Sequence, residues 1–161
     1  MKRRWLRFVV VFVSVSILLG LVGKFVATPF LVVGESMEPT LRSLDLCVLK
    51  RVRHYQPARG DIVMFRTADN PPLYFIKRVI ALPGQTIAIE SGFVKINGEL
   101  LDEPYAPPNP GLELPATNVP PGKVWVIGDN RWGSLSTMVA TRLVQAELIW
   151  HWRWKPEKES K

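Results

Sequence analysis

The chain of 161 residues contains one cysteine, Cys47, and only two histidines, His54 and His151. A single cysteine excludes an intramolecular disulfide and any metal site built from several cysteines. His54 follows a basic run and His151 stands between two tryptophans, so neither lies in a recognisable catalytic motif. The sequence therefore disfavours a Ser-His-Asp triad or a zinc site, and we expect no metal and no cofactor.

Acidic residues are absent from the first 28 positions, where five basic residues stand. The whole chain has a net charge of +7, but the remaining residues hold 16 basic and 14 acidic side chains. A nucleic-acid-binding domain should carry its basic residues on its folded body, so we expect no nucleic-acid partner. Hydrophobic residues make up 47% of the chain and charged residues 22%, which excludes a disordered polar chain.

The longest uncharged run, 8–23, has 16 residues between Arg7 and Lys24. As a helix it spans about 24 Å, and the two flanking side chains extend it toward the ~30 Å hydrocarbon core of a bilayer. The preceding basic residues predict a cytoplasmic N-terminus. We predict that residues 1–28 are a basic tail and a single-pass anchor in the plasma membrane, with the lipid bilayer as a partner, and that 29–161 form an extracytoplasmic domain. A cleaved signal peptide and a buried core helix remain as alternatives.

Beyond this run, short segments rich in β-branched residues indicate a mostly β fold with antiparallel strands. Asn97-Gly98 is the strongest hairpin signal in the chain. Seven of the 14 prolines fall within 104–122, which predicts a long surface loop because proline removes a ladder hydrogen bond. The strands are predicted at 44–52, 61–66, 73–82, 86–90, 93–96, 123–127 and 142–154.

Three tryptophans, Trp150, Trp152 and Trp154, alternate near the C-terminus and would share one face of a strand. Two interpretations stay open. The tryptophans pack in the core, or they form a rim at the membrane interface, where tryptophan is favoured.

One serine and one lysine stand in unusual surroundings. Ser36 lies between Gly34 and Pro39, which indicates a turn with exposed backbone. Lys77 is a charge inside the apolar segment 73–82. Burial there would lower the pKa of its amine, and a serine beside such a base is an activated nucleophile without histidine. The alternative is that Lys77 reaches solvent and Ser36 caps a turn, and spacing alone leaves both open.

Five segments, in order along the chain, resemble the motifs of type I signal peptidases, the bacterial leader peptidases. Residues 34–41 resemble their serine motif and 74–84 their lysine motif. The other segments are 59–65, 94–105 and 128–134, so the resemblance covers nearly the whole chain. It implies a β-rich catalytic domain of a membrane-bound serine endopeptidase that removes N-terminal signal peptides from secretory preproteins.

The resemblance also implies roles for the matching residues. Ser36 would be the nucleophile, Lys77 the general base, and Ser134 the residue that orients the Lys77 amine. The Ser36 backbone N–H would donate to the oxyanion. Some members add a second donor through a hydroxyl at the position of Gly34, where only a backbone is available here, so the second donor stays open. Met37 would lie near the substrate cleft.

The chain departs from the family pattern after Ser134. Ser136 stands where the family has an acid and Met138 where it has an arginine, and a Gly-Pro stretch is missing. An Asp–Arg pair that braces the site is therefore absent or supplied elsewhere. Two alternative functions stay open. One is a specialised organellar or conjugation-type processing peptidase, and the other is a catalytically impaired, membrane-anchored binding module.

Overall fold

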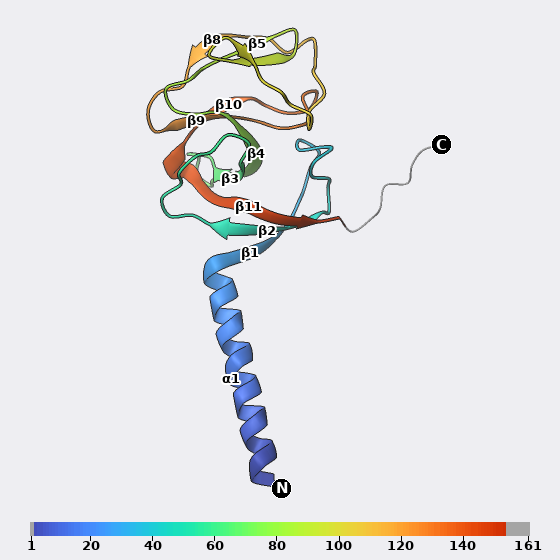
Figure 1. Ribbon diagram of the computed structural model, residues 1–161, viewed down its shortest axis with the longest axis vertical. Coiled ribbons are helices and arrows are strands. Elements are labelled where there is room, and N and C mark those ends of the chain that lie inside the picture. The colour runs from blue at the N-terminus through green and yellow to red at the C-terminus, as the bar shows by residue number, and fades with distance from the viewer. Residues whose placement is uncertain (1, 154–161) are drawn as a thin grey trace, which may run out of the picture.

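The computed structural model describes residues 2–153, in which a long helix precedes two β-sheets (Figure 1). The helix α1, Lys2–Val26, leads directly into the first strand. One sheet has seven strands in the order β1-β2-β11-β3-β4-β9-β10, and the other has four in the order β7-β6-β5-β8. Every pair is antiparallel, which confirms the predicted mostly β fold. The strands are β1 Ala27–Leu31, β2 Leu46–Arg51, β3 Ile62–Arg66, β4 Tyr74–Ala81, β5 Thr86–Glu90, β6 Phe93–Ile96, β7 Glu99–Leu100, β8 Leu114–Asn118, β9 Lys123–Ile127, β10 Thr137–Ala140 and β11 Val144–Trp152, with a 3-10 turn, Thr141–Leu143, before β11.

Strand β4 lies inside the larger sheet, between β3 and β9. Successive side chains on a strand point to opposite faces, so Phe75, Lys77 and Val79 share one face. The pairing of β3 with β4 sets Val63 opposite Lys77. Along β4 the side chains change from exposed at Tyr74 to buried from Lys77 onward. The position of the strand therefore places an amine at the boundary of the core.

The smaller sheet contains the predicted hairpin. Strands β6 and β7 are joined by Asn97 and Gly98, whose φ angles are +55° and +86°. A type I′ turn requires positive φ at both central residues, which asparagine and glycine reach at low cost. The buried side chains of this sheet pack against those of the larger sheet in one cluster. Its members are Ile80, Ala81, Ile87, Ile89, Val94, Ile96, Val119, Trp125 and Ile127.

Residues 104–122 are not a continuous loop, and that prediction is wrong. Strand β8 lies within this segment and pairs with β5 at the edge of the smaller sheet. Pro115 fits there because an edge strand needs ladder hydrogen bonds on one side only. The other proline-containing strand, β1 with Pro29, is also an edge strand. The sequence pattern predicts neither β1 nor β10.

Large apolar side chains of α1 are exposed. Trp5 is 71% exposed and Phe12 is 75% exposed, and the helix extends away from the two sheets (Figure 1). The core-helix alternative is therefore wrong. Among the residues that the structure describes, no helix has both the length and the apolar character required to cross a membrane.

The tryptophans of β11 do not pack in the core. Trp150 is 52% exposed and Trp152 is 44% exposed, while Trp154 lies outside the described residues. Core packing is therefore wrong for the first two tryptophans, and their contact with a membrane stays a prediction.

Candidate active site

Ser36 lies in a tight turn that follows β1. Gly34 precedes it with a φ of +102°, a backbone conformation that favours glycine. The Glu38 N–H donates to the Glu35 carbonyl oxygen at 3.1 Å and closes the turn around the serine. Ser36 is half-buried and lines a cleft with a volume of about 790 Å³.

Met37 attaches this turn to the body of the protein. Its side chain is buried and packs with Val32, Leu41 and Cys47. It faces the core and is not among the residues that line the cleft, so its predicted position near the substrate stays a prediction. Successive side chains of the turn thus differ in direction, since Ser36 lines the cleft and Met37 is buried.

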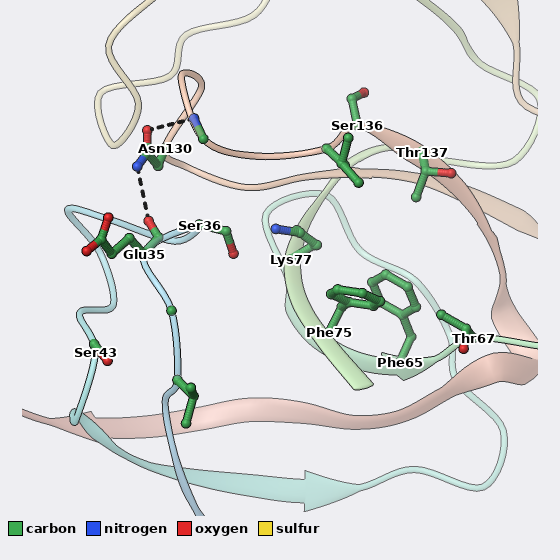
Figure 2. A pocket seen from close by; sticks show the side chains of 14 residues that line it. Glu35, Ser36, Ser43, Phe65, Thr67, Phe75, Lys77, Asn130, Ser136 and Thr137 are labelled. Atoms are coloured by element: carbon green, nitrogen blue, oxygen red, sulfur yellow. Dashed lines mark hydrogen bonds between the residues drawn. The ribbon is translucent and has the colours of Figure 1, made fainter. Parts of the chain in front are cut away.

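Lys77 reaches the same cleft from β4. The side chains of Ser36 and Lys77 point toward each other, and the rings of Phe65 and Phe75 lie beside the lysine (Figure 2). Lys77 is only 5% exposed. Burial lowers the pKa of its amine to about 8, and the negative charge of Asp129 acts in the opposite direction. A substantial fraction of the amine is therefore neutral near physiological pH.

Ser134 lies behind the lysine. Its hydroxyl oxygen accepts hydrogen bonds from the Lys77 Nζ and from the Gly128 N–H, both at 2.9 Å. Its own proton goes to the Leu135 carbonyl oxygen at 3.2 Å. A hydroxyl has one proton to donate, so Lys77 must be the donor in its bond to Ser134. The structure therefore brings together Ser36, Lys77 and Ser134, the three side chains singled out in the sequence.

Gly128 separates the serine turn from Ser134. A Cβ added at Gly128 would overlap the Ser36 carbonyl oxygen and the Ser134 hydroxyl. Asn130, two residues later, donates its backbone N–H to the Ser36 carbonyl oxygen at 3.2 Å. Its side-chain amide donates to the Glu35 carbonyl oxygen, also at 3.2 Å (Figure 2). The segment that carries Ser134 is thus in direct contact with the backbone of the candidate nucleophile.

A buried ion pair lies next to Lys77. The Arg78 guanidinium donates to both carboxylate oxygens of Asp129, at 2.8 and 2.6 Å. Thr40, on the serine turn, donates its hydroxyl to the same carboxylate. The Tyr105 ring covers the arginine, with the guanidinium carbon 3.9 Å from the ring centre. These contacts connect the serine turn, β4 and the loop after β9.

A second buried pair supports the same loop. Arg131 donates to both oxygens of Glu103, at 3.0 and 2.6 Å, and its Nε donates to the Gly128 carbonyl oxygen at 3.1 Å. Because both side chains are almost fully buried, the pair is screened little by solvent. The loop from Gly128 to Ser134 is therefore held from two sides.

The family described as signal peptidase, peptidase S26, matches residues 4–141. The chain belongs to this family. The predicted family is thus confirmed, and with it the enzyme class of a signal peptidase I.

Individual relatives agree with this assignment. The probable signal peptidase I-1 of Synechocystis sp. is 40% identical over 147 residues, which cover 85% of this chain and 75% of that protein. The signal peptidase I of Bacillus licheniformis is 32% identical over 157 residues, which cover 90% of this chain and 82% of that protein. A second Synechocystis relative, the probable signal peptidase I-2, is matched over only 63% of its length.

A solved structure shows the same fold. The crystal structure of a signal peptidase I from Enterococcus faecalis has a TM-score of 0.51 and 26% sequence identity to this chain. The matched region covers 59% of this chain and 98% of the chain in that structure. The β-rich part of the chain is therefore a signal-peptidase-like fold.

The departure from the signal peptidase pattern after Ser134 has a structural counterpart. The Ser136 hydroxyl accepts a hydrogen bond of 2.6 Å from the indole Nε1 of Trp125. Met138 packs half-buried against the apolar cluster between the sheets. The segment is thus fixed by the Trp125–Ser136 bond and by apolar contact, while Arg78–Asp129 and Arg131–Glu103 supply the buried ion pairs.

Sequence reasoning did not identify these supporting residues. Arg78, Asp129 and Arg131 stand within the signal peptidase motifs, but the spacing of a motif does not show which charges meet. The available signal was their residue type, because a buried arginine or aspartate is usually paired with an opposite charge. Trp125 gave no such signal, since its bond to Ser136 depends on the pairing of β9 with β10.

Proposed function

We propose that this signal peptidase cleaves preproteins with Ser36 as nucleophile and Lys77 as general base. The observation that carries the proposal is the buried Lys77 amine, which faces Ser36 and is held by Ser134 at 2.9 Å. A serine hydroxyl is a weak nucleophile at its ordinary pKa and needs a neighbouring base. Burial supplies that base by lowering the pKa of the lysine to about 8.

Ser134 determines where the lysine presents its lone pair. Ser134 donates its hydroxyl proton to the Leu135 carbonyl oxygen. Neutral Lys77 must therefore donate one of its N–H groups to Ser134. The lone pair on nitrogen is then directed away from Ser134 and can accept the Ser36 proton. This arrangement gives Ser134 the part of the third residue in a catalytic triad, which orients the base.

The reaction follows from these positions. Ser36 Oγ attacks the carbonyl carbon of the scissile peptide while its proton moves to Lys77 Nζ. The tetrahedral intermediate collapses, the C–N bond breaks, and the leaving amine takes the proton from Lys77. Water then attacks the acyl ester on Ser36, with Lys77 accepting a proton and returning it to the serine.

The backbone N–H of Ser36 is the proposed donor to the oxyanion. Within the described chain this N–H donates to no other group, so it is available to a substrate carbonyl. Gly34 lines the same cleft but offers only its backbone. A backbone donor at Gly34 is proposed as the second contact, and each such donor typically accounts for about 10²–10³ in kcat.

We further propose that α1 anchors the enzyme in the plasma membrane, with the N-terminus in the cytoplasm and the catalytic body outside. The uncharged run 8–23 lies inside α1, and its large described side chains are exposed to a surrounding that must be apolar to stabilise them. Both enzyme and signal peptide would then be held by the same bilayer, which raises their effective concentration. Residues 1–28 and 29–161 are the proposed membrane and catalytic parts.

The test is cleavage of a secretory preprotein by the full chain in proteoliposomes. Wild type is expected to cut after a small residue just beyond the apolar part of the signal peptide, and Ser36→Ala and Lys77→Ala are expected to be inactive. Ser14→Ala and Lys95→Ala, which remove the same groups from positions that do not line the cleft, serve as matched controls. A folded wild-type protein that cuts no preprotein would favour the binding-module alternative. Narrow selectivity for one precursor would favour the specialised processing peptidase.

A further inference from the structure

A second cavity is lined by residues of the larger sheet that do not line the cleft at Ser36, and it has no place in the proposed mechanism. Its volume of about 610 Å³ falls within the ~300–1,000 Å³ of typical ligand sites. Leu49 and Ala146, both buried, are part of its apolar lining. The polar part of the lining consists of Thr28, Arg51, Arg53, Tyr74 and Gln145.

The polar side chains of this lining all carry hydrogen-bond donors. Two arginines, a hydroxyl, a phenol and an amide converge on it, and none of its lining residues is acidic. Neither Arg51 nor Arg53 forms an ion pair with a carboxylate of residues 2–153. The Arg51 Nε donates to the Thr28 hydroxyl at 3.2 Å, which leaves the other guanidinium N–H groups available. This donor set is complementary to a phosphate, which a guanidinium binds through two parallel hydrogen bonds.

The cavity is adjacent to the end of α1. Thr28 is the second residue after the helix, and Arg51 ends β2, whose pairing with β1 sets Lys50 opposite Ala27. In Figure 1 this end of β2 lies where α1 meets β1. The basic run before His54 in the sequence is thereby brought to the junction between the helix and the sheet.

We propose that this cavity binds the headgroup of an anionic glycerophospholipid from the membrane leaflet next to it. The inference rests on the proposed anchoring of α1, because only then does the cavity lie at headgroup level. Arg51 and Arg53 contact the phosphate, and Thr28 holds Arg51 in position. The apolar floor at Leu49, Met64 and Ala146 accommodates the glycerol and the first carbons of the chains.

The experiment uses full-length protein reconstituted in vesicles of phosphatidylcholine, with and without phosphatidylglycerol. The protein is extracted in mild detergent, and retained lipid is counted by native mass spectrometry. Wild type is expected to retain phosphatidylglycerol in preference to phosphatidylcholine. The double substitution Arg51→Gln and Arg53→Gln should lower this retention by about tenfold or more, since each basic side chain contributes to anionic-lipid affinity.

Two further variants make the result specific. Lys123→Gln with Arg142→Gln removes the same charge from exposed positions that do not line the cavity, and should retain lipid like wild type. Arg51→Lys keeps the charge but loses the forked geometry, and should show intermediate retention. Equal retention of both lipids by wild type, or unchanged retention in the Arg51 and Arg53 double variant, overturns the proposal.

Two additional measurements separate the possible sources of failure. Inorganic phosphate that displaces the retained lipid at low concentration would identify a general anion site and overturn the lipid assignment. Flotation of the vesicles and preprotein cleavage are measured on the same samples. A wild-type protein that floats and cleaves but shows no lipid preference contradicts this inference alone. A protein that does not float contradicts the anchoring, and the lipid site with it.

Discussion

The Lys77 Nζ lies 2.9 Å from the Ser134 hydroxyl oxygen, whose proton is donated to the Leu135 carbonyl. This pairing has a direction, because Ser134 accepts from the lysine and cannot donate to it in the same arrangement. In the proposed mechanism the lysine therefore keeps its lone pair for Ser36, toward which it points (Figure 2). The proposed chemistry of the site depends on this orientation as much as on the lowered pKa of Lys77.

The rate of cleavage should rise with pH through the pKa of Lys77, about 8, because only the neutral amine accepts a proton. Below that pH, kcat/KM should increase about tenfold per pH unit, and above it the rate should level off. An unperturbed lysine, with a pKa of about 10.4, would place the plateau more than two units higher. A pH profile of preprotein cleavage that is half-maximal near pH 10 would contradict the assignment of Lys77 as base.

The same pKa shift predicts how stability depends on pH. The folded pKa of Lys77, about 8, lies below its ordinary value of 10.5, so the unfolded chain binds more protons between these values. Folding stability contributed by this group therefore rises over that window and is lost as pH falls through 8. Lys77→Met removes the cost of burying the charge, and at pH 7 it should raise the free energy of unfolding by less than about 3 kcal/mol. Denaturant unfolding of both proteins at pH 7 and pH 10 measures the difference.

Ser134→Ala should lower kcat by roughly 10- to 100-fold, which is less than the full contribution of a general base. The variant keeps Lys77 but removes the acceptor that orients its amine. KM and the melting temperature should change little, because Ser134 lies in a loop and is half-buried. Single-turnover kinetics on a preprotein would reveal the loss, and a wild-type rate would mean that another group positions Lys77.

The bond between Trp125 and Ser136, at 2.6 Å, should be coupled to catalysis through the position of Ser134. Trp125→Phe and Ser136→Ala should each lower kcat severalfold, in line with a hydrogen bond worth about 1 kcal/mol. The double variant should be no slower than either single variant, since both remove the same bond. Independent, multiplying losses in kcat would show that the two residues act separately.

Asp129→Ala should destabilise the fold by about 3–5 kcal/mol, because it leaves the Arg78 guanidinium buried without its partner. Lys95→Ala, in the exposed pair Lys95–Glu90, provides the matched comparison and should cost less than about 1 kcal/mol. Chemical unfolding in detergent gives both values. Similar losses in the two variants would show that Arg78 and Asp129 contribute no more than a surface pair.

Gly128→Ala should abolish cleavage, because the added methyl group overlaps the Ser36 carbonyl oxygen and the Ser134 hydroxyl. Gly111→Ala is the control, since its Cβ would meet nothing closer than the Asn109 side-chain oxygen at 3.4 Å. Cleavage assays on both variants, with circular dichroism to verify folding, test this prediction. An active Gly128→Ala enzyme would mean that the loop has more room than its contacts indicate.

Much of the fold could be predicted because its signals are local. Alternating side chains mark β5 and β6, and Asn97 with Gly98 marks the turn after β6. The strands that escaped prediction lie at sheet edges, where burial is incomplete and prolines such as Pro29 and Pro115 are tolerated. Whether such a segment forms an edge strand depends on pairing with a neighbouring strand, and the sequence pattern of the segment itself does not show that pairing.

The residues of the candidate site also fall into those that could be predicted from the local sequence and those that could not. Ser36 and Lys77 stand out by residue type against their surroundings, and the signal peptidase motifs add Ser134. The supports of these residues come from pairs that are far apart in the chain, such as Arg131 with Glu103 and Trp125 with Ser136. No local pattern indicates such a pair, because the contact exists only once the sheets have formed.

The direct passage from α1 into β1 has a consequence for where a substrate is cut. No linker separates Val26 from the strand, and Ala27 is already paired with Lys50. On the proposed anchoring, the height of Ser36 above the bilayer is therefore set by sheet hydrogen bonds and cannot vary as a flexible tether would. An enzyme anchored in this way would measure a fixed length of extended polypeptide from the membrane surface, and this length would select the scissile bond together with the side chains around it.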